Sequence, residues 1–471
     1  MVSASDEHAQ RMRERVGGFF GHPRGLGYLV AVEGFWAFSY FGLQTILTLY
    51  MTRQLLATGH AEHVLGFTAY RRMLEGGGPP LGAIDIASQT YGLLTSLAYA
   101  LPLVGAVIAD RWLGQKRTMI LGLVILSVAM AVMVFEQAFL IAIGLIVIGN
   151  GLLKCNLMVS IGRLYAPDDT RRTSAFAFYL IAANIGSFSS PLVAGTLAER
   201  VGFQAGLIAL AIGMMGALAA YLAGLSHVSG AAAPAGERDG GKAARLSRRD
   251  LLVAAVLVAV LVPEMVHFAA YQQSFNIFPI WAADHVQRTI LGFEMPVTWF
   301  STLDGLLTIA GAAVTIRLWD RQAADGRPMG DLTKIAIGCA MGLVGFAILA
   351  VGAMAPGKAP LGAAVGYFLL VDPAIIWVDT VTLALISRAA PASINSTMVG
   401  VYTLAMSASY FGTGQLGRLY EHMSPPAFWA VHAGADVVCL VFLVLAGPAI
   451  ARVLAGKGAT AESTPASAPA G

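Results

Sequence analysis

The stretch AFLIAIGLIVIGNGLLKCNLMVSIG, residues 138–162, decides the fold, because a long apolar run is interrupted by one charged side chain, Lys154. About 20 apolar residues suffice for a helix to cross the hydrocarbon core of a bilayer. The whole chain agrees, since 57% of its 471 residues are hydrophobic and 12% are charged, whereas a soluble domain carries roughly 25% charged residues. The sequence therefore predicts an all-α integral membrane protein.

Runs of the same character recur along the chain and predict twelve transmembrane helices in two bundles of six. The predicted spans are 27–51, 84–109, 118–135, 138–162, 173–198, 202–225, 251–282, 296–318, 332–354, 361–387, 395–419 and 427–452. The predicted domains are a cytoplasmic N-terminus (1–26), a first bundle (27–225), a linker (226–250), a second bundle (251–455) and a disordered tail (456–471). The linker is rich in Gly, Ala and basic residues, and 52–83 is the longest outer loop.

Lysine and arginine predict the orientation. If the N-terminus is cytoplasmic, the inner segments hold 22 of the 30 basic residues and the outer segments hold seven, while Lys154 lies inside a span. Cytoplasmic loops of membrane proteins are enriched in Lys and Arg. Both termini are therefore expected in the cytoplasm, and the polar start of the chain predicts no cleaved signal peptide.

Several other classes of protein find little support. Cys155, Cys339 and Cys439 lie far apart inside apolar runs, so we predict buried thiols and no metal site. The basic residues form no stripe with interleaved aromatics, so no nucleic-acid partner is expected. The sequence shows no nucleophile and base at a spacing that would indicate an enzyme. A membrane receptor or scaffold stays an alternative, which the charges inside the spans do not favour.

A first motif lies after the second span. GAVIADRWLGQKR (105–117) resembles the loop of major facilitator transporters that reads Gly-x-x-x-Asp-Arg-x-Gly-x-Lys/Arg. A glycine-permitted turn places Asp110 near helix ends and basic residues. We interpret Asp110 and Arg111 as a conformational latch, the alternative being contact with substrate. Two six-helix halves with a central inner linker fit the same superfamily.

Further stretches resemble the proton-dependent oligopeptide transporter (POT) family. GHPRGLGYLVAVEGFWAFSYFG (21–42) is similar to the opening GHPRxL…ExxERFSYYG, and GNGLLKCN (149–156) is similar to GxGxxKPN. FAFYLIAANIGSF (176–188) resembles the signature ending in Asn-x-Gly-Ser, with mismatches at Leu180 and Ala183. In the second half the resemblance lies in GFEMPVTWFSTLDG (292–305) and PASINSTMVGVY (391–402).

The resemblance implies a monomeric inner-membrane transporter that imports di- and tripeptides or peptide-like compounds, driven by protons and without a cofactor. It also implies basic groups on helices 1 and 4 for the peptide carboxylate, and acids on helix 10 for the amino group. The chain departs from the family at several of these positions. Glu33 matches the family motif. Residues that differ from those of the family stand at other positions: Trp36, Ala37, Phe41, Gln44, Gln272, Asp304 and Ile375.

A charge at the bilayer centre costs roughly 3 kcal/mol or more, so it usually faces the bundle interior. Lys154 and Glu33 lie at similar depth, at about 13 and 10 Å from the inner ends of their helices at 1.5 Å per residue. We predict that they pair. The pair is either a structural ion pair that holds helices 1 and 4 together or a site that binds the substrate and the proton. In the second case Lys154 is the cation for a substrate carboxylate.

The second half carries further candidates. Asp379 follows the missing acid at Ile375 by one turn, and Asp304 replaces a family amide. Each is a candidate for the substrate amino group and, with Glu33 and Glu264, for proton coupling, or else for a cap or core contact. Glu264 and His267, one turn apart after Pro263, are predicted to form a proton site or to stabilise a proline break. The remaining candidates, for lining the cavity or for packing, are Tyr40, Gln44, Asn184, Gln273, Trp36 and Trp377, with Asp372, His432 and Asp436 as weaker ones.

These observations lead to one functional prediction and one alternative. The prediction is a secondary transporter that imports peptides with protons by alternating access. The alternative is an exporter, or an importer of a non-peptide or modified amino-acid compound with altered coupling, because the binding arginines and several acids of the family are missing.

Overall fold

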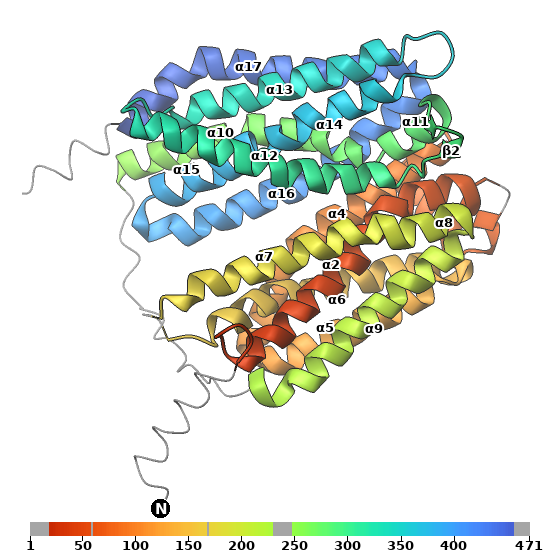
Figure 1. Ribbon diagram of the computed structural model, residues 1–471, viewed down its shortest axis with the longest axis horizontal. Coiled ribbons are helices and arrows are strands. Elements are labelled where there is room, and N and C mark those ends of the chain that lie inside the picture. The colour runs from red at the N-terminus through yellow and green to blue at the C-terminus, as the bar shows by residue number, and fades with distance from the viewer. Residues whose placement is uncertain (1–17, 58–59, 167–168, 229–246, 456–471) are drawn as a thin grey trace, which may run out of the picture. The chain divides into compact units, whose positions relative to one another are not determined.

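The structure is a computed structural model that describes residues 18–57, 60–166, 169–228 and 247–455 (Figure 1). The predicted tail 456–471, most of the linker and the first 17 residues lie outside this part. The described chain divides into two compact units. The first unit holds 18–228 with Ser274–Asp284 and Arg288–Leu306, and the second holds 247–273, His285–Gln287 and Leu307 onward. Because two pieces of the second half group with the first unit, the domain boundaries near 225 and 251 stay a prediction.

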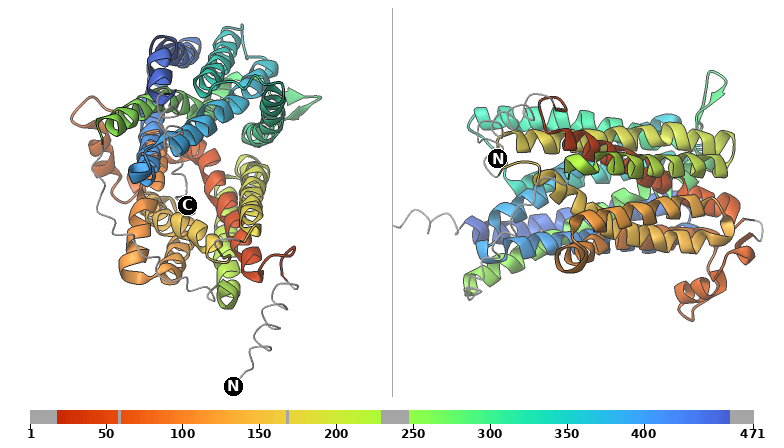
Figure 2. Two further views of the ribbon diagram at one scale, coloured as in Figure 1. Left: turned by 90° about the vertical axis from the view of Figure 1, so that its left-hand side faces the viewer. Right: turned by 90° about the horizontal axis from the view of Figure 1, so that it is seen from below.

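The described part of the first unit is built on six long helices. In chain order they are α2 (Arg24–Tyr50), α4 (Ala83–Ile108), α5 (Gln115–Met133), α6 (Phe139–Gly162), α7 (Arg171–Ser190) and α9 (Phe203–Val228). α2 packs against α7 and α9, and α6 packs against α4 and α5. The left view of Figure 2 looks nearly along these helices and shows the red α2 beside the yellow α7 and α9.

Small residues let these helices approach closely. A Cβ at Gly186 of α7 would lie 2.2 Å from the backbone oxygen of Gly34 on α2, and a Cβ at Gly105 of α4 would lie 1.9 Å from the oxygen of Gly151 on α6. Membrane helices commonly use glycine in this way, because packing between helices in lipid depends on close van der Waals contact. The two contacts bring α7 to α2 and α4 to α6.

Several of these helices continue in another helical form. π-Helical turns extend α2 through Met51–Leu55 and α4 through Ala109–Leu113, and α7 continues through Pro191–Gly195 into α8 (Thr196–Arg200). The predicted spans lie within a few residues of the observed ones. The outer loop predicted at 52–83 also contains α3 (Phe67–Glu75), with left-handed glycines at both of its ends, and a short 3₁₀ turn at His60–His63.

The second unit is also a helical bundle (Figure 1). α10 packs against α16 and α17, and α13 packs against α14 and α17. In chain order the helices are α10 (Arg248–Tyr271), α13 (Asp331–Gly352), α14 (Leu361–Ile375), α15 (Val381–Ala389), α16 (Asn395–Gly417) and α17 (Pro425–Ala455). A π-helical turn, Ile376–Thr380, joins α14 to α15. α12 (Trp299–Ala324) has its first residues in the first unit and the rest in the second.

The prediction of one helix over 251–282 is wrong. α10 ends at Tyr271, a 3₁₀ turn covers Gln272–Ser274, and α11 (Phe278–His285) begins anew. Pro279 lies in the first turn of α11 and suits the restart there, because proline lacks the N–H that a continuing helix needs. A hairpin of β1 (Thr289–Ile290) and β2 (Phe293–Glu294) follows, which the sequence reading missed.

Eleven helices in the described residues are long and apolar enough to cross a membrane. The exception among the twelve predicted spans is the region 395–419. Its helix, α16, is 23 residues long but is polar for a span, with several Ser, Thr and Gly residues. The twelve predicted spans therefore all correspond to helical structure, and the fold is a mostly helical, multi-pass membrane protein.

Candidate functional site

Lys154 and Glu33 form the predicted pair. Lys154 Nζ of α6 donates to Glu33 Oε1 of α2 at 2.9 Å and to Oε2 at 3.1 Å. Tyr179 of α7 brings its hydroxyl to 2.9 Å from the same Nζ. The side chain of Lys154 is 22% exposed and that of Glu33 is 2% exposed. Three helices thus hold one ammonium, and the carboxylate lies behind it.

Trp36 completes this cluster from α2. Lys154 Nζ lies 3.5 Å from the centroid of the Trp36 ring, and Trp36 Nε1 donates to Asn150 Oδ1 at 2.7 Å. A cation over an indole face gains roughly 0.5–2 kcal/mol, depending on its desolvation. Trp36 stands where the POT motif has an acid, so an aromatic face lies where a second carboxylate is expected. The sequence reading missed Asn150 and Tyr179, although Asn150 lies one turn before Lys154 and therefore on the same face.

Tyr40 and Gln44 continue the polar face of α2. The Tyr40 ring stacks on Trp36 with centroids 4.9 Å apart and an interplanar angle of 14°. Both Tyr40 and Gln44 are buried, and the Tyr40 hydroxyl and Gln44 Nε2 find no hydrogen-bond partner in the described chain. Buried polar atoms are usually hydrogen-bonded. These two groups are thus suited to bind a polar ligand or water beside the Lys154 cluster.

In the second unit, His267 pairs with Asp436. His267 Nδ1 of α10 lies 2.7 Å from Asp436 Oδ1 of α17, and both side chains are fully buried. The proton site predicted at Glu264 and His267 stays a prediction. Asp436 is one of the weaker candidates, and 169 residues separate it from His267.

Glu264 instead lies beside another acid. Its carboxyl is next to Asp379 and Thr382, and Asp379 accepts a hydrogen bond from Tyr402. Glu264 is fully buried, and neither of its oxygens meets a hydrogen-bond geometry in the described chain. Asp379 lies in the π-helical turn between α14 and α15. Asp379 is partly buried. Two neighbouring carboxyl groups, of which one is fully buried, cannot both be ionised without a large cost, so they are suited to share a proton.

His267, Cys339 and Asp436 bring three candidate ligand atoms within 4.8 Å of one another. The His267–Asp436 separation of 2.7 Å is a hydrogen-bond length. Two ligands of a tetrahedral zinc ion, each about 2.1 Å from the metal, would be about 3.4 Å apart. We therefore assign this group to hydrogen bonding and not to metal binding.

The other predicted residues are dispersed. Gln273 is buried and donates to the Thr413 carbonyl at 3.0 Å, and Trp377 donates to Thr315 Oγ1 at 3.0 Å. Asn184 is exposed and donates to Leu180 of its own helix at 2.9 Å, and Asp304 is buried on α12. Of the weaker candidates, His432 binds the Phe428 carbonyl at 2.8 Å and Asp372 is buried on α14. None of these contacts identifies a substrate site.

The turn of the 105–117 motif is present. Gly114 adopts a φ of 73°, which glycine tolerates without strain, and its N–H bonds to the Ala109 carbonyl at 3.0 Å. Asp110 and Arg111 are exposed, and their side chains make no hydrogen bond or ion pair with the described residues. Their role as a latch stays a prediction.

An acidic clamp at the end of α8 was not predicted. Glu199 accepts hydrogen bonds from the backbone N–H groups of Val297 and Thr298 and from Thr298 Oγ1, each at 2.8 Å. Trp299 Nε1 also donates to Thr196 Oγ1 at 2.8 Å. The clamp ties the start of α12 to α8, and all five residues belong to the first unit. The three acceptor contacts give the carboxylate the role of a cap for the free N–H groups at a helix start.

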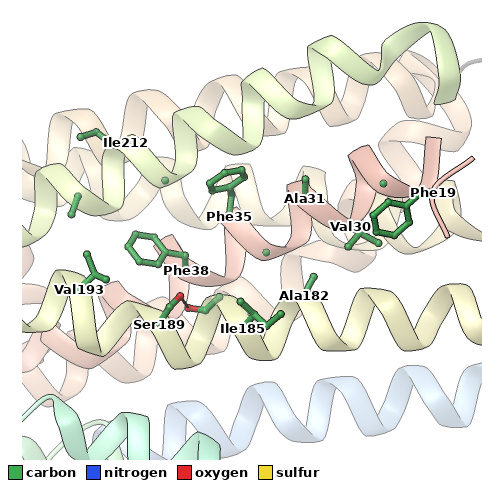
Figure 3. A pocket seen from close by; sticks show the side chains of 15 residues that line it. Phe19, Val30, Ala31, Phe35, Phe38, Ala182, Ile185, Ser189, Val193 and Ile212 are labelled. Carbon is green, nitrogen blue, oxygen red and sulfur yellow. Dashed lines mark hydrogen bonds between the residues drawn. The ribbon is translucent and has the colours of Figure 1, made fainter. Parts of the chain in front are cut away.

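A cavity of about 630 Å³ lies between α2, α7 and α9 (Figure 3). Phe35 and Phe38 of α2, Ile185 of α7 and Ile212 of α9 converge on it, and Ser189 supplies a side-chain hydroxyl. No charged side chain lines it. A peptide needs partners for its charged ends, so this cavity is not a candidate substrate site.

The comparisons with known proteins agree with this architecture. The profile of the Major Facilitator Superfamily matches residues 29–414. The chain belongs to the major facilitator superfamily. Among the curated proteins, it is 25% identical to the peptide transporter YePEPT of Yersinia enterocolitica, over 93% of this chain and 96% of that protein. It is also 25% identical to a di-/tripeptide transporter of Lactococcus lactis subsp. cremoris, over 93% of this chain and 97% of the relative.

Solved structures show the same fold. A crystal structure of a mutant peptide transporter POT in complex with alafosfalin matches with a TM-score of 0.81 and 22% identity, over 95% of this chain and 99% of that one. A POT family transporter in complex with a thioalcohol-conjugated peptide matches with a TM-score of 0.74 and 20% identity, over 93% and 98%. The predicted major facilitator fold and the predicted resemblance to POT transporters are confirmed. The named relatives are transporters, as predicted for this chain.

Proposed function

We propose that this transporter imports short peptides or peptide-like compounds together with protons. The observation that carries the proposal is the Lys154 cluster, in which a partly exposed ammonium is held by Glu33 and Tyr179 within the first unit. A free peptide carries a terminal carboxylate, and a partly exposed cation with aromatic neighbours is a strong anchor for it. The names of the relatives, a peptide transporter and di-/tripeptide transporters, support the same substrate class.

The geometry also suggests how a proton and a substrate affect one another at this cluster. Lys154 cannot give its full strength to a substrate carboxylate while Glu33 takes two of its hydrogen bonds. A proton on Glu33 removes the negative charge and frees the ammonium. The binding of a proton to Glu33 and the binding of the substrate to Lys154 are thereby linked. A proton that crosses the membrane down a potential of 100 mV releases about 2.3 kcal/mol, which can drive transport. The gradient is the driving force in this proposal, and no cofactor takes part.

The charge pattern of the sequence supports both termini in the cytoplasm. From the resemblance to the POT family we propose a monomer in the cell inner membrane that alternates access. The alternative of an exporter, or of a carrier for non-peptide compounds, is not favoured by the relatives.

The deciding experiment is uptake of labelled di- and tripeptides into proteoliposomes with an imposed inward proton gradient. The proposal expects accumulation above the external concentration, which collapses when a protonophore is added. Empty liposomes and liposomes without a pH difference are the controls. No uptake above empty liposomes, for a panel that covers acidic, basic and apolar peptides, would overturn the proposal.

A further inference from the structure

The second unit contains a buried histidine with an open nitrogen among three carboxyl groups. His267 Nδ1 is hydrogen-bonded to Asp436, while His267 Nε2 and Asp436 Oδ2 have no hydrogen-bond partner in the described chain. Buried polar atoms are usually hydrogen-bonded, so these unpaired atoms need an explanation. A neutral imidazole whose Nδ1–H is held by a carboxylate presents the lone pair of Nε2, which is a proton acceptor.

The groups that face His267 come from every element around it. On α10 itself, Glu264 lies one turn before His267, next to Asp379, and Asp379 also interacts with His267. Cys339 of α13 lies within 4.8 Å of the His267–Asp436 pair. The titratable side chains around His267 are Glu264, Cys339, Asp379, Asp436 and Cys439, with Tyr402 bound to Asp379.

No lysine or arginine of the described chain forms an ion pair with Glu264, Asp379 or Asp436. The cluster therefore has three acids and a single basic group, His267. In a dry interior, unbalanced negative charges are costly. Binding protons is the way in which these groups can reduce their negative charge. One proton on the Glu264–Asp379 pair neutralises one carboxylate, and one on His267 gives Asp436 a charged partner.

The backbone is shaped to hold this arrangement. A Cβ at Gly342 of α13 would lie 2.4 Å from Asp436 Oδ2 and 2.7 Å from His267 Cε1. Glycine at this position therefore lets α13 cover the pair closely. Asp379 lies in a π-helical turn, a form that is frequent at functional sites, and α10 breaks five residues after His267. A proton on His267 would thus change contacts beside two irregular parts of the helices, which are the π-helical turn that holds Asp379 and the end of α10.

From this geometry we infer that His267, Asp436, Glu264 and Asp379 form a proton-binding site within the second unit, separate from the residues of the Lys154 cluster. The inference rests on the proposed proton-coupled transport and names where the driving proton binds. His267 Nε2 accepts the proton, and Asp436 positions the ring and stabilises the charged form. The Glu264–Asp379 pair holds a second proton. The site thereby supplies acids that the chain lacks at Trp36, Gln272 and Ile375.

The test compares proton-driven accumulation with counterflow exchange, which needs no net proton movement, for Asp436→Asn and His267→Gln. Both variants should lose accumulation while keeping exchange and peptide affinity. His432→Gln is the matched control, because His432 is an equally buried histidine that binds the Phe428 carbonyl instead of a carboxylate. It should accumulate substrate as the wild type does. Accumulation by Asp436→Asn with the wild-type dependence on pH would overturn the inference.

A measurement without substrate separates this inference from the proposed function. In detergent-solubilised protein labelled with ¹⁵N-histidine, the resonance that is lost in His267→Gln should respond to pH, and the response should differ in Asp436→Asn. A His267 resonance that stays unchanged from pH 4 to pH 10 would overturn the site even if peptides are transported. Stoichiometric zinc in the purified protein, measured by mass spectrometry, would overturn it as well.

Discussion

Lys154 Nζ donates to both carboxylate oxygens of Glu33, at 2.9 and 3.1 Å, across α6 and α2. The pair is almost entirely removed from solvent on the Glu33 side. Breaking a buried ion pair by removing one partner typically costs about 3–5 kcal/mol, because the other charge is left uncompensated. The pair therefore has consequences both for folding and for transport.

We expect Lys154→Gln to abolish peptide uptake and to lower thermal stability, because Glu33 loses its counter-charge. The double variant Glu33→Gln/Lys154→Gln removes both charges and should regain most of the stability without regaining uptake. Uptake into proteoliposomes and the melting temperature in detergent measure the two effects. Lys334→Gln is the control, because Lys334 also lies over a tryptophan, 4.1 Å from the Trp319 ring centroid, in the second unit. Wild-type flux in the double variant would assign the pair to structure alone.

We expect Trp36→Phe to weaken substrate binding more than it affects folding. Phenylalanine keeps a ring beside Tyr40 but loses the hydrogen bond from Nε1 to Asn150 and part of the attraction to Lys154. Each of these contacts is worth on the order of 1 kcal/mol. Calorimetric titration with a transported peptide gives the affinity. Asn150→Leu leaves Trp36 in place but removes its acceptor, so an unchanged affinity in both variants would contradict a role for Trp36 in orienting Lys154.

We expect Glu199→Ala to loosen the start of α12. Three hydrogen bonds of 2.8 Å are lost, from Val297 and Thr298, and a lost cap costs about 0.5–2 kcal/mol. Hydrogen exchange of the 297–299 amides should become faster, and the melting temperature should fall. Glu62→Ala is a suitable control, because Glu62 is exposed on a short 3₁₀ turn. Equal protection of the 297–299 amides in the wild type and Glu199→Ala would show that the cap contributes nothing.

We expect Gly342→Ala to destabilise the second unit. The new methyl group would lie 2.4 Å from Asp436 Oδ2, so the His267–Asp436 pair must shift, and overpacking of this kind costs about 1–3 kcal/mol. Gly434→Ala is the control, since a Cβ there meets nothing within 4 Å on α17. Alanine normally favours a helix over glycine by about 1 kcal/mol. The melting temperature of the control should thus stay equal or rise, and a Gly342→Ala variant as stable as the control would contradict the tight fit.

We expect acid to destabilise the protein partly through His22, which precedes α2. Burial, reinforced by the charge of Arg171, lowers the pKa of His22 below its ordinary value of 6.5. Folding therefore favours the neutral ring, whose Nδ1 lies 2.8 Å from the Tyr165 hydroxyl. Its contribution to stability is present above the unfolded pKa and is lost as the pH falls through it. The difference in melting temperature between the wild type and His22→Gln should thus shrink from pH 8 to pH 5, and a constant difference would exclude this linkage.

Much of the fold follows from local properties of the chain. Apolar runs of membrane length predicted helices within a few residues of the observed spans, because a helix in lipid satisfies its own backbone hydrogen bonds. The failure at 251–282 has a local cause too, since Pro279 restarts the helix beyond a polar turn. The polarity of α16 likewise reflects residues visible in the sequence.

The candidate sites also combine features that follow from a single helix with features that only the packing of several helices decides. The sequence by itself determined that Lys154 and Glu33 lie at similar depth in their helices, since rise per residue converts positions into depth. Only the tertiary structure decided that His267 meets Asp436 and not Glu264. Depth depends on one helix alone, whereas a partner depends on how neighbouring helices rotate and how closely they pack. For α10, α13 and α17, that packing includes Gly342, where the missing side chain leaves room for the pair.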